Sequence, residues 1–185
     1  MINVLSAFGL SSAAGLNAYL PLLIVGLLAR YTDLIHLQSP WNTLENPWVL
    51  GGLAILLIIE MTADKIPAVD SVNDAIQTVI RPTAGAILFA ASNNAIADMS
   101  PALALMLGLV AAGSTHAVKA TARPIVTTTT AGMGNPVVSV MEDVTSAIMT
   151  LIAIILPAIA AILVLIFGFF TLRWLWRRRR PQAAT

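Results

Sequence analysis

The chain has 185 residues, of which 58% are hydrophobic and 10% charged, and its mean hydropathy is +0.86. Soluble domains average about 45–50% apolar and about 25% charged residues, so this composition indicates a membrane protein and leaves no room for a separate soluble domain. The formal net charge is +1, yet five of the ten basic residues lie in the last thirteen positions, so the rest of the chain is acidic. The absence of cysteine excludes disulfides and thiolate metal sites.

The N-terminal thirty residues are apolar, but small and polar residues interrupt them. The interruptions are Ser11, Ser12, Gly15, Asn17 and Pro21. They leave open whether residues from about 14 to 29 form a tilted membrane span or a broken helix. Because the N-terminus lacks the basic region of a cleavable signal peptide, we expect it to remain in the mature chain.

Two further segments have an uncertain relation to the membrane. The linker over residues 31–47 carries apolar residues at helical spacing, which predicts a helix lying along the membrane interface. These apolar residues are Leu34, Leu37, Trp41 and Leu44. The segment over residues 82–97 is short and rich in small residues, so it is either a span or a re-entrant segment.

Three segments are long and apolar enough to cross a hydrocarbon core of about 30 Å. They are residues 47–63, 101–118 and 149–172. Each of the first two opens with a proline, which suits the first position of a helix because no hydrogen bond is lost there. In the third segment, Pro157 predicts a kink near the middle.

The C-terminal residues 173–185 form a basic tail. Trp174 and Trp176 predict an interfacial aromatic anchor, and the arginines around them predict a cytoplasmic C-terminus at a bacterial inner membrane. The candidate contacts for anionic lipid are Arg177, Arg178, Arg179 and Arg180. Directly after a membrane span these arginines favour lipid over nucleic acid. We therefore predict a single multi-pass, all-α membrane domain over residues 1–172, followed by this cytoplasmic tail.

A polar stripe follows the predicted span over residues 47–63. Asp70, Asp74, Gln77 and Arg81 fall at i, i+4, i+7 and i+11, on one side of a helix whose other side is apolar. One interpretation is a helix at the membrane interface with its carboxylates in water. The other is a stripe that faces a wet cavity, where the carboxylates need a cation, a proton or a basic side chain between them.

Two of the predicted spans end in ionisable residues of opposite sign. Glu60 and Asp64 share a helix face, while His116, Lys119 and Arg123 fall at i, i+3 and i+7 on another segment. We therefore expect ion pairs between the acids of one segment and the bases of the other. A charge within a membrane costs about 2.5–3.5 kcal/mol on insertion scales, which makes Glu60 the best functional candidate. The alternatives are a structural pair for Glu60 and, for His116, either a proton relay or a hydrogen-bonded helix residue.

The remaining polar candidates lie in the predicted breaks and in the last third of the chain. Two acidic residues, Glu142 and Asp143, repeat the acidic pattern and join the predicted solute or ion pathway. Asparagines at predicted helix breaks, with a capping role as the simpler interpretation, are Asn17, Asn93, Asn94 and Asn135. With two histidines far apart in the chain and no phosphate-binding glycine loop, we expect neither a metal site nor a cofactor.

The chain shows a weak internal similarity. A shift of 56 positions aligns "GLAILLIIEMTADKI" with "GLVAAGSTHAVKATA", which places Glu60 opposite His116. Pro67, Val69 and Asp74 likewise match Pro136, Val138 and Asp143. These matches predict a first repeat over about residues 5–80 and a second over about residues 82–150, with broken or re-entrant helices meeting around a pseudo-twofold axis. Chance similarity between apolar sequences is the alternative.

Three stretches, "GLSSAAGLNAYLPLL", "DKIPAVDSVNDAIQTVIRP" and "GNPVVSVMEDV", carry a resemblance to a known family. The chain resembles a bacterial family of small integral membrane proteins classed as a domain of unknown function. This resemblance implies a membrane location and implies no substrate and no catalytic residues.

We expect a transporter or channel-like protein for a small polar or ionic solute, with its site between the two repeats. The alternative is a membrane scaffold or lipid-interacting protein that transports nothing. We do not expect an enzyme, because no nucleophile or metal set accompanies the carboxylates. Small residues that permit close approach of helices, and with it a homo-oligomer, are Gly51, Gly52, Gly108 and Gly113.

Overall fold

The structure, a computed structural model, describes residues 4–92 and 99–178. The regular elements in these ranges are helices, as predicted. They are α1 (Val4–Leu16), α2 (Tyr19–Tyr31), the 3-10 helix η1 (Trp41–Glu45), α3 (Pro47–Ala63), α4 (Pro67–Ala91), α5 (Pro101–Thr130), α6 (Asn135–Ile155) and α7 (Pro157–Arg178).

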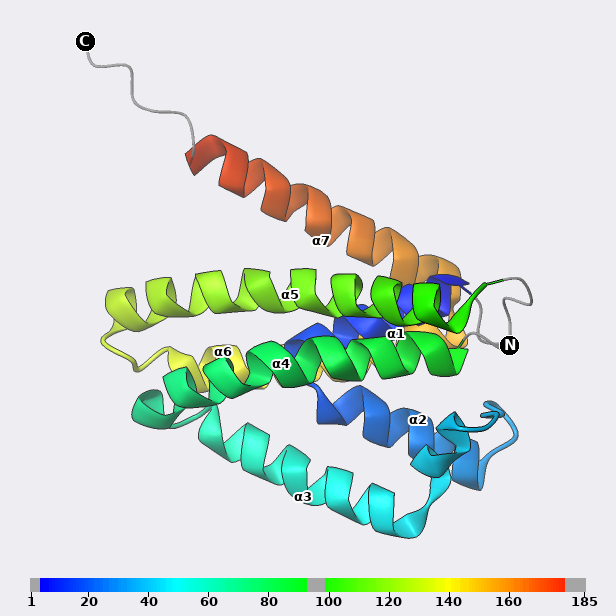
Figure 1. Ribbon diagram of the computed structural model, residues 1–185. Coiled ribbons are helices and arrows are strands. Elements are labelled where there is room, and N and C mark those ends of the chain that lie inside the picture. Colours follow the sequence, from blue (N-terminus) through cyan, green and yellow to red (C-terminus); the bar gives the residue numbers. More distant parts are fainter. Residues whose placement is uncertain (1–3, 93–98, 179–185) are drawn as a thin grey trace.

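The helices form a layered bundle (Figure 1). Helices α1, α4, α5 and α6 make up its centre, and α4 and α5 run antiparallel along most of their length. Helices α2 and α3 lie on one side of this centre and α7 lies on the other, inclined to the bundle. The α3–α4 and α5–α6 connections lie at the same end of the bundle, so four helix termini that are distant in sequence come together there.

Prolines and polar caps mark where several helices begin. Helix α3 starts at Pro47, and the Asn46 side chain accepts a hydrogen bond of 2.9 Å from the backbone N–H of Trp48. Helix α5 starts at Pro101, and the Ser100 hydroxyl accepts one of 3.3 Å from Leu103. Both arrangements satisfy backbone donors that a helix N-terminus leaves without a partner.

The apolar N-terminal segment is a broken helix, and the alternative of a tilted continuous span is wrong. Helix α1 ends at Leu16, and α2 starts at Tyr19. The Asn17 side-chain oxygen accepts hydrogen bonds from the backbone N–H groups of Tyr19 (3.2 Å) and Leu20 (2.9 Å). Asn17 therefore provides the donors at the break with a partner, which is the capping role that the sequence predicted.

Three other boundaries differ from the sequence predictions. Residues 82–91 are not a separate segment, because α4 continues through Pro82 from the polar stripe. The predicted span over residues 149–172 is divided at Leu156, so its first part completes α6 and its second part belongs to α7; the break lies at the predicted kink, directly before Pro157. The linker 31–47 forms a helix only at η1, and its Ile35 and Leu44 enter the core instead of lying along a surface.

In α4 and α6 the polar face points inward and the apolar face points outward. In α4, the Arg81 side chain is 0% exposed while Val79 is 70% exposed. In α6, the buried residues are Asn135, Ser139, Asp143, Ser146, Thr150 and Ala153. The outward residues of α6 include Val137, Val140, Met141, Val144, Ile148 and Leu151. This is the reverse of the pattern expected in water, where large contiguous apolar surfaces are rare. Among the described helices, α5 and α6 are long and apolar enough to cross a membrane.

Glycines let α1, α4 and α5 approach closely within one chain. A Cβ atom on Gly85 of α4 would overlap the Ala112 side chain and lie 2.8 Å from the Gly108 carbonyl oxygen. Ser11 of α1 donates a hydrogen bond of 2.8 Å to the Gly85 carbonyl oxygen at the same crossing. Gly108 therefore serves packing inside the chain, whereas Gly51 and Gly52 face open space.

We expect Gly85→Leu to destabilise the protein by about 1–3 kcal/mol or more, since the added side chain has no room between α4 and α5. The matched control is Gly51→Leu, which meets nothing within 4 Å and should gain up to about 1 kcal/mol from helix propensity. Thermal unfolding in detergent measures both. Equal melting temperatures for the two variants would contradict the close packing of α4 on α5.

Candidate functional site

A cluster of buried ionisable side chains lies among α3, α4, α5 and α6, at the level of the α3–α4 connection. Its acidic members are Glu60, Asp64, Asp74, Glu142 and Asp143, and its basic members are Lys65, Arg81, Lys119 and Arg123. The ring of His116 borders the same cluster. Arg81 and His116 lie near the middle of α4 and α5, so the cluster reaches into the bundle and is not confined to its end.

Asp64, at the C-terminal end of α3, is the most highly connected acid. Its Oδ2 atom accepts hydrogen bonds from Lys119 Nζ at 3.0 Å and Arg123 Nη2 at 3.3 Å, and Arg81 Nη2 lies 3.7 Å away. Its Oδ1 atom accepts a hydrogen bond of 2.6 Å from the Asn73 side-chain amide. Acid from α3 thus pairs with base from α5, which confirms the ion pairs expected between these segments.

Arg81 connects the acids of α3 and α4 to the histidine of α5. It donates to Glu60 Oε1 from Nε (3.3 Å) and Nη2 (3.0 Å), and to Asp74 Oδ1 from Nη1 (3.3 Å). Its Nη1 atom also lies 3.0 Å from His116 Nδ1, and His116 Nε2 lies 3.1 Å from the Thr78 hydroxyl. Because Arg81 can only donate, His116 Nδ1 is an acceptor and the ring is neutral. His116 is thus a hydrogen-bonded helix residue.

Helix α6 closes the other side of the cluster. Glu142 Oε2 accepts from Arg123 Nη2 at 2.6 Å and lies 3.1 Å from Lys119 Nζ. The neighbouring Asp143 accepts a hydrogen bond of 2.9 Å from the Asn17 side-chain amide and lies 3.8 Å from Lys65 Nζ. Asn17 therefore has two roles, since it caps the break between α1 and α2 and also fixes an acid of α6.

A polar cavity of about 440 Å³ adjoins the cluster between α4 and α5. Its lining residues are Asp74, Ala75, Thr78, Ala120, Arg123, Pro124, Thr127 and Thr128. Asp74 and Arg123 belong to the ionic cluster, so this cavity gives a small polar molecule access to charged side chains. Thr78 connects the cavity to His116 and, through it, to Arg81.

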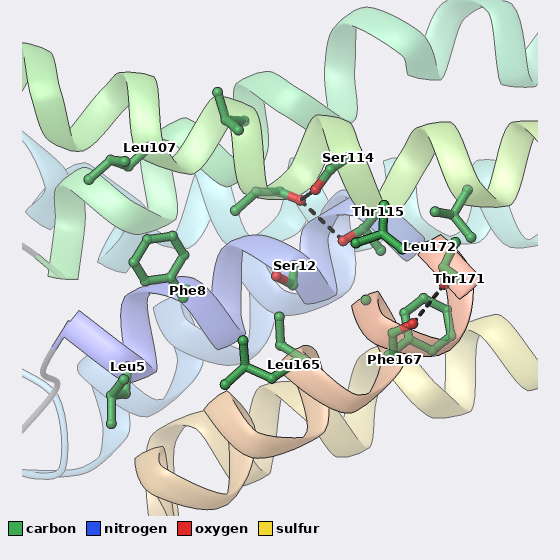
Figure 2. A pocket seen from close by; sticks show the side chains of 15 residues that line it. Leu5, Phe8, Ser12, Leu107, Ser114, Thr115, Leu165, Phe167, Thr171 and Leu172 are labelled. Carbon is green, nitrogen blue, oxygen red and sulfur yellow. Dashed lines mark hydrogen bonds between the residues drawn. The ribbon is translucent and has the colours of Figure 1, made fainter. Parts of the chain in front are cut away.

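A second, larger cavity of about 620 Å³ lies between α1, α5 and α7 and is lined mainly by apolar side chains (Figure 2). The hydroxyls of Ser114 and Thr115 donate to the Ala111 carbonyl oxygen in their own helix, and that of Thr171 donates to Phe167. These hydroxyls therefore offer little to a polar ligand. The ionic cluster with its smaller cavity is the better candidate site for a polar solute.

The structure brings most of the predicted site residues together and leaves a few elsewhere. Asn135 is the first residue of α6 and not its cap, and its side chain hydrogen-bonds Thr127. The side chain of Asp70 lies outside the described side chains, as do Asn93, Asn94 and the predicted lipid contacts Arg177, Arg178, Arg179 and Arg180.

The sequence did not lead us to predict three of the site residues, Arg81, Lys65 and Thr78. Arg81 had a usable signal, because it lies seven positions after Asp74 on the same helical stripe. Thr78 had the same signal, because it lies four positions after Asp74, whereas Lys65 had none, since its partner Asp143 is distant in sequence. Among the described residues, no group of three or more His, Cys, Asp or Glu side chains is arranged to hold a metal ion.

Fold and site together define an all-helical protein with apolar outer faces and a charged interior. The chain belongs to the family described as domain of unknown function (DUF4126), whose family model matches residues 4–178. Comparison with curated proteins found no match, and comparison with solved structures found none either.

Proposed function

We propose that the protein is a multi-pass protein of the bacterial inner membrane that transports or conducts a small polar or ionic solute. The solute site lies at the ionic cluster, between the α3–α4 and α5–α6 helix pairs. The C-terminal tail faces the cytoplasm, where its arginines contact anionic lipid.

The membrane location is supported by the outward apolar faces of the helices. Residues of α3 that are 55% exposed or more include Trp48, Ile55, Ile58 and Ile59, while the buried residues of this helix are Leu50 and Glu60. Such a surface costs free energy in water and none in hydrocarbon, at roughly 25 cal/mol per Å² of apolar area. The two long apolar helices α5 and α6 support the same location.

The observation that carries the solute site is the buried ionic cluster with a polar cavity beside it. Each charge that is moved out of water carries a penalty of several kcal/mol, which ion pairs offset only in part. Asp64 and Arg81 are 2% and 0% exposed, so they bear this penalty in full. A chain that required only stability would do better with apolar residues here, whereas a pathway for polar solutes requires charged ones.

A twofold internal repeat over about residues 5–80 and 82–150 is part of this proposal, with the boundary between the two repeats inside α4. Helices α3 and α5 both lead through a short connection into a helix, α4 or α6, that begins at or beside a proline and turns its polar stripe inward. The matched residues Asp74 and Asp143 both lie within the cluster. Two such halves around a central site are a common plan of membrane transporters.

Flux into liposomes that contain the purified protein tests this function. Sodium, potassium, chloride, inorganic phosphate and glycerol are the probes, and flux of at least one should exceed that of protein-free liposomes. Glu60→Gln should reduce that flux by roughly tenfold or more, equivalent to about 1.4 kcal/mol of barrier. Glu45→Gln is the matched control, because Glu45 lies in η1 outside the cluster.

The alternative is a membrane scaffold or lipid-interacting protein in which the ionic cluster only fixes the helices. The observation that favours this alternative is the set of ion pairs inside the chain, which provides partners for Asp64, Lys119 and Arg123. If no probe crosses faster than in protein-free liposomes, and Glu60→Gln behaves like the unmodified protein, the scaffold is the better description.

A further inference from the structure

We propose that Glu60 is a proton-binding site, where one proton binds to and leaves the Oε2 atom. Any part that this proton plays in solute movement rests on the proposed transport function. As a proton site it depends only on the charges and contacts of the described residues.

The ionic cluster contains one more acid than base. Five carboxylates face four cationic side chains among the described residues. If the peripheral pair of Lys65 and Asp143 is left out, four carboxylates still face three cations. His116 adds no charge, because its Nδ1 atom accepts from Arg81. One additional positive charge would make this buried cluster neutral, and a single proton supplies it.

Two buried carboxylate oxygens of the cluster, Glu60 Oε2 and Asp143 Oδ2, have no hydrogen-bond partner. Asp143 Oδ2 lies 3.8 Å from the Lys65 ammonium, and Glu60 is the more deeply buried of the two acids, at 1% against 6% exposed, so the proton belongs on Glu60. Two nitrogens of Arg81 donate to Oε1, whereas Oε2 is buried without a hydrogen-bond partner. An ionised carboxylate beside an arginine usually engages both oxygens in a two-pronged pair. A neutral carboxylic acid instead accepts at its carbonyl oxygen and carries a hydrogen on the other. The contacts of Glu60 match the neutral acid, with Oε1 as the carbonyl oxygen.

A second buried acceptor lies on the same side of the cluster. Gln77 is one helical turn before Arg81 in α4, and its Oε1 atom also has no hydrogen-bond partner. Gln77 is 2% exposed, so water does not supply a donor easily. Like Glu60 Oε2, the Gln77 Oε1 atom is thus a buried acceptor that lacks a donor.

A proton is a better occupant than a metal cation. A monovalent metal ion requires several oxygen ligands, and the Arg81 guanidinium at 3.0 Å from Glu60 repels any further cation that keeps its charge. A proton needs one lone pair and becomes part of a neutral group. In the binding step, hydronium transfers its proton to the carboxylate, an O–H bond forms at Oε2, and water is left; release reverses this step.

The groups around Glu60 connect it to the polar cavity. They are Tyr19 from α2, Asp64 at the end of α3, Asp74, Gln77 and Arg81 from α4, and His116 and Lys119 from α5. Arg81 lies between Glu60 and Asp74, and Asp74 lines the cavity. Arg81 does not release its own protons, so it holds Glu60 and Asp74 in one hydrogen-bonded group without relaying a proton between them.

Infrared spectroscopy of the protein in a maltoside detergent, which has no carbonyl group, tests the proposal. At neutral pH we expect a band of a protonated carboxylic acid that shifts in D₂O and disappears in Glu60→Gln. Glu45→Gln should retain the band. Glu60→Asp should retain a protonated band at a changed frequency, and this variant keeps the test valid if the glutamine variant fails to fold.

Two results would overturn the proposal: no protonated carboxylic acid in the unmodified protein at neutral pH, or a band that survives unchanged in both Glu60 variants. The outcome is independent of transport, since the spectrum requires no flux. A protonated Glu60 in a protein that moves no solute would remove the proposed function and leave the proton site. Solute flux without the band of a protonated acid would support the proposed function and remove the proton site.

Discussion

Replacing Arg81 by glutamine should destabilise the protein by about 3–5 kcal/mol, because it removes one partner of a buried pair and leaves the other charge uncompensated. Arg81 is 0% exposed and lies within 3.3 Å of both Glu60 and Asp74. Glutamine retains a donor but no charge, so Asp64 and Asp74 would lose the cation that lies between them in a region that little water enters. Thermal unfolding in detergent, followed by circular dichroism, measures the effect.

Arg30→Gln is the matched control for Arg81. Arg30 is exposed and donates a hydrogen bond of 2.8 Å to the Glu45 carbonyl oxygen, outside the ionic cluster. Its replacement should change stability by no more than about 0.5 kcal/mol. If the Arg81 and Arg30 variants unfold at the same temperature, the cluster does not depend on Arg81 and its buried contacts are misassigned.

Asp64→Asn should have an effect of similar size, about 3 kcal/mol, for the opposite reason. It leaves Lys119 and Arg123, which are 4% and 3% exposed, with Glu142 as their shared acid. Two cations beside one carboxylate repel each other, and neither can reach water easily. The exposed Asp33 provides the control variant Asp33→Asn, which should unfold like the unmodified protein.

A double-mutant cycle separates the ion pair from a general loss of packing. Combining Asp64→Asn with Lys119→Met should cost less than the sum of the single changes, with a coupling of about 1–3 kcal/mol, since Lys119 Nζ and Asp64 Oδ2 are 3.0 Å apart. Additive effects would show that the two side chains do not interact in solution, contrary to the structure.

The apolar cavity between α1, α5 and α7 has no counterpart in the sequence predictions. Its lining residues come from three helices, for example Phe8, Val110 and Leu165, and each is an ordinary apolar residue of its own helix. Nothing in the local sequence distinguishes a side chain that lines this cavity from one that faces the outside. The cavity depends on how α7, which is inclined to the bundle (Figure 1), packs against α1 and α5.

The sequence by itself determined the class of fold and many local features. Composition indicated helices with apolar surfaces, and prolines at positions 47 and 101 marked helix starts, because these preferences depend on a few neighbouring residues. The spacing of Asp74, Gln77 and Arg81 likewise placed them on one side of a helix, since the helical period alone fixes that relation.

The tertiary structure decided which way that side faces and which charges meet. A polar stripe turns outward in water and inward in hydrocarbon, so the interface and interior interpretations of α4 could not be separated from its sequence. Pairs such as Asp64 with Lys119, which are 55 positions apart, depend on how α3 and α5 pack. Pro82 stays within α4 because packing against neighbouring helices holds the helix together there. The break at Leu156 is different, since it directly precedes Pro157, where local propensity alone predicted a kink.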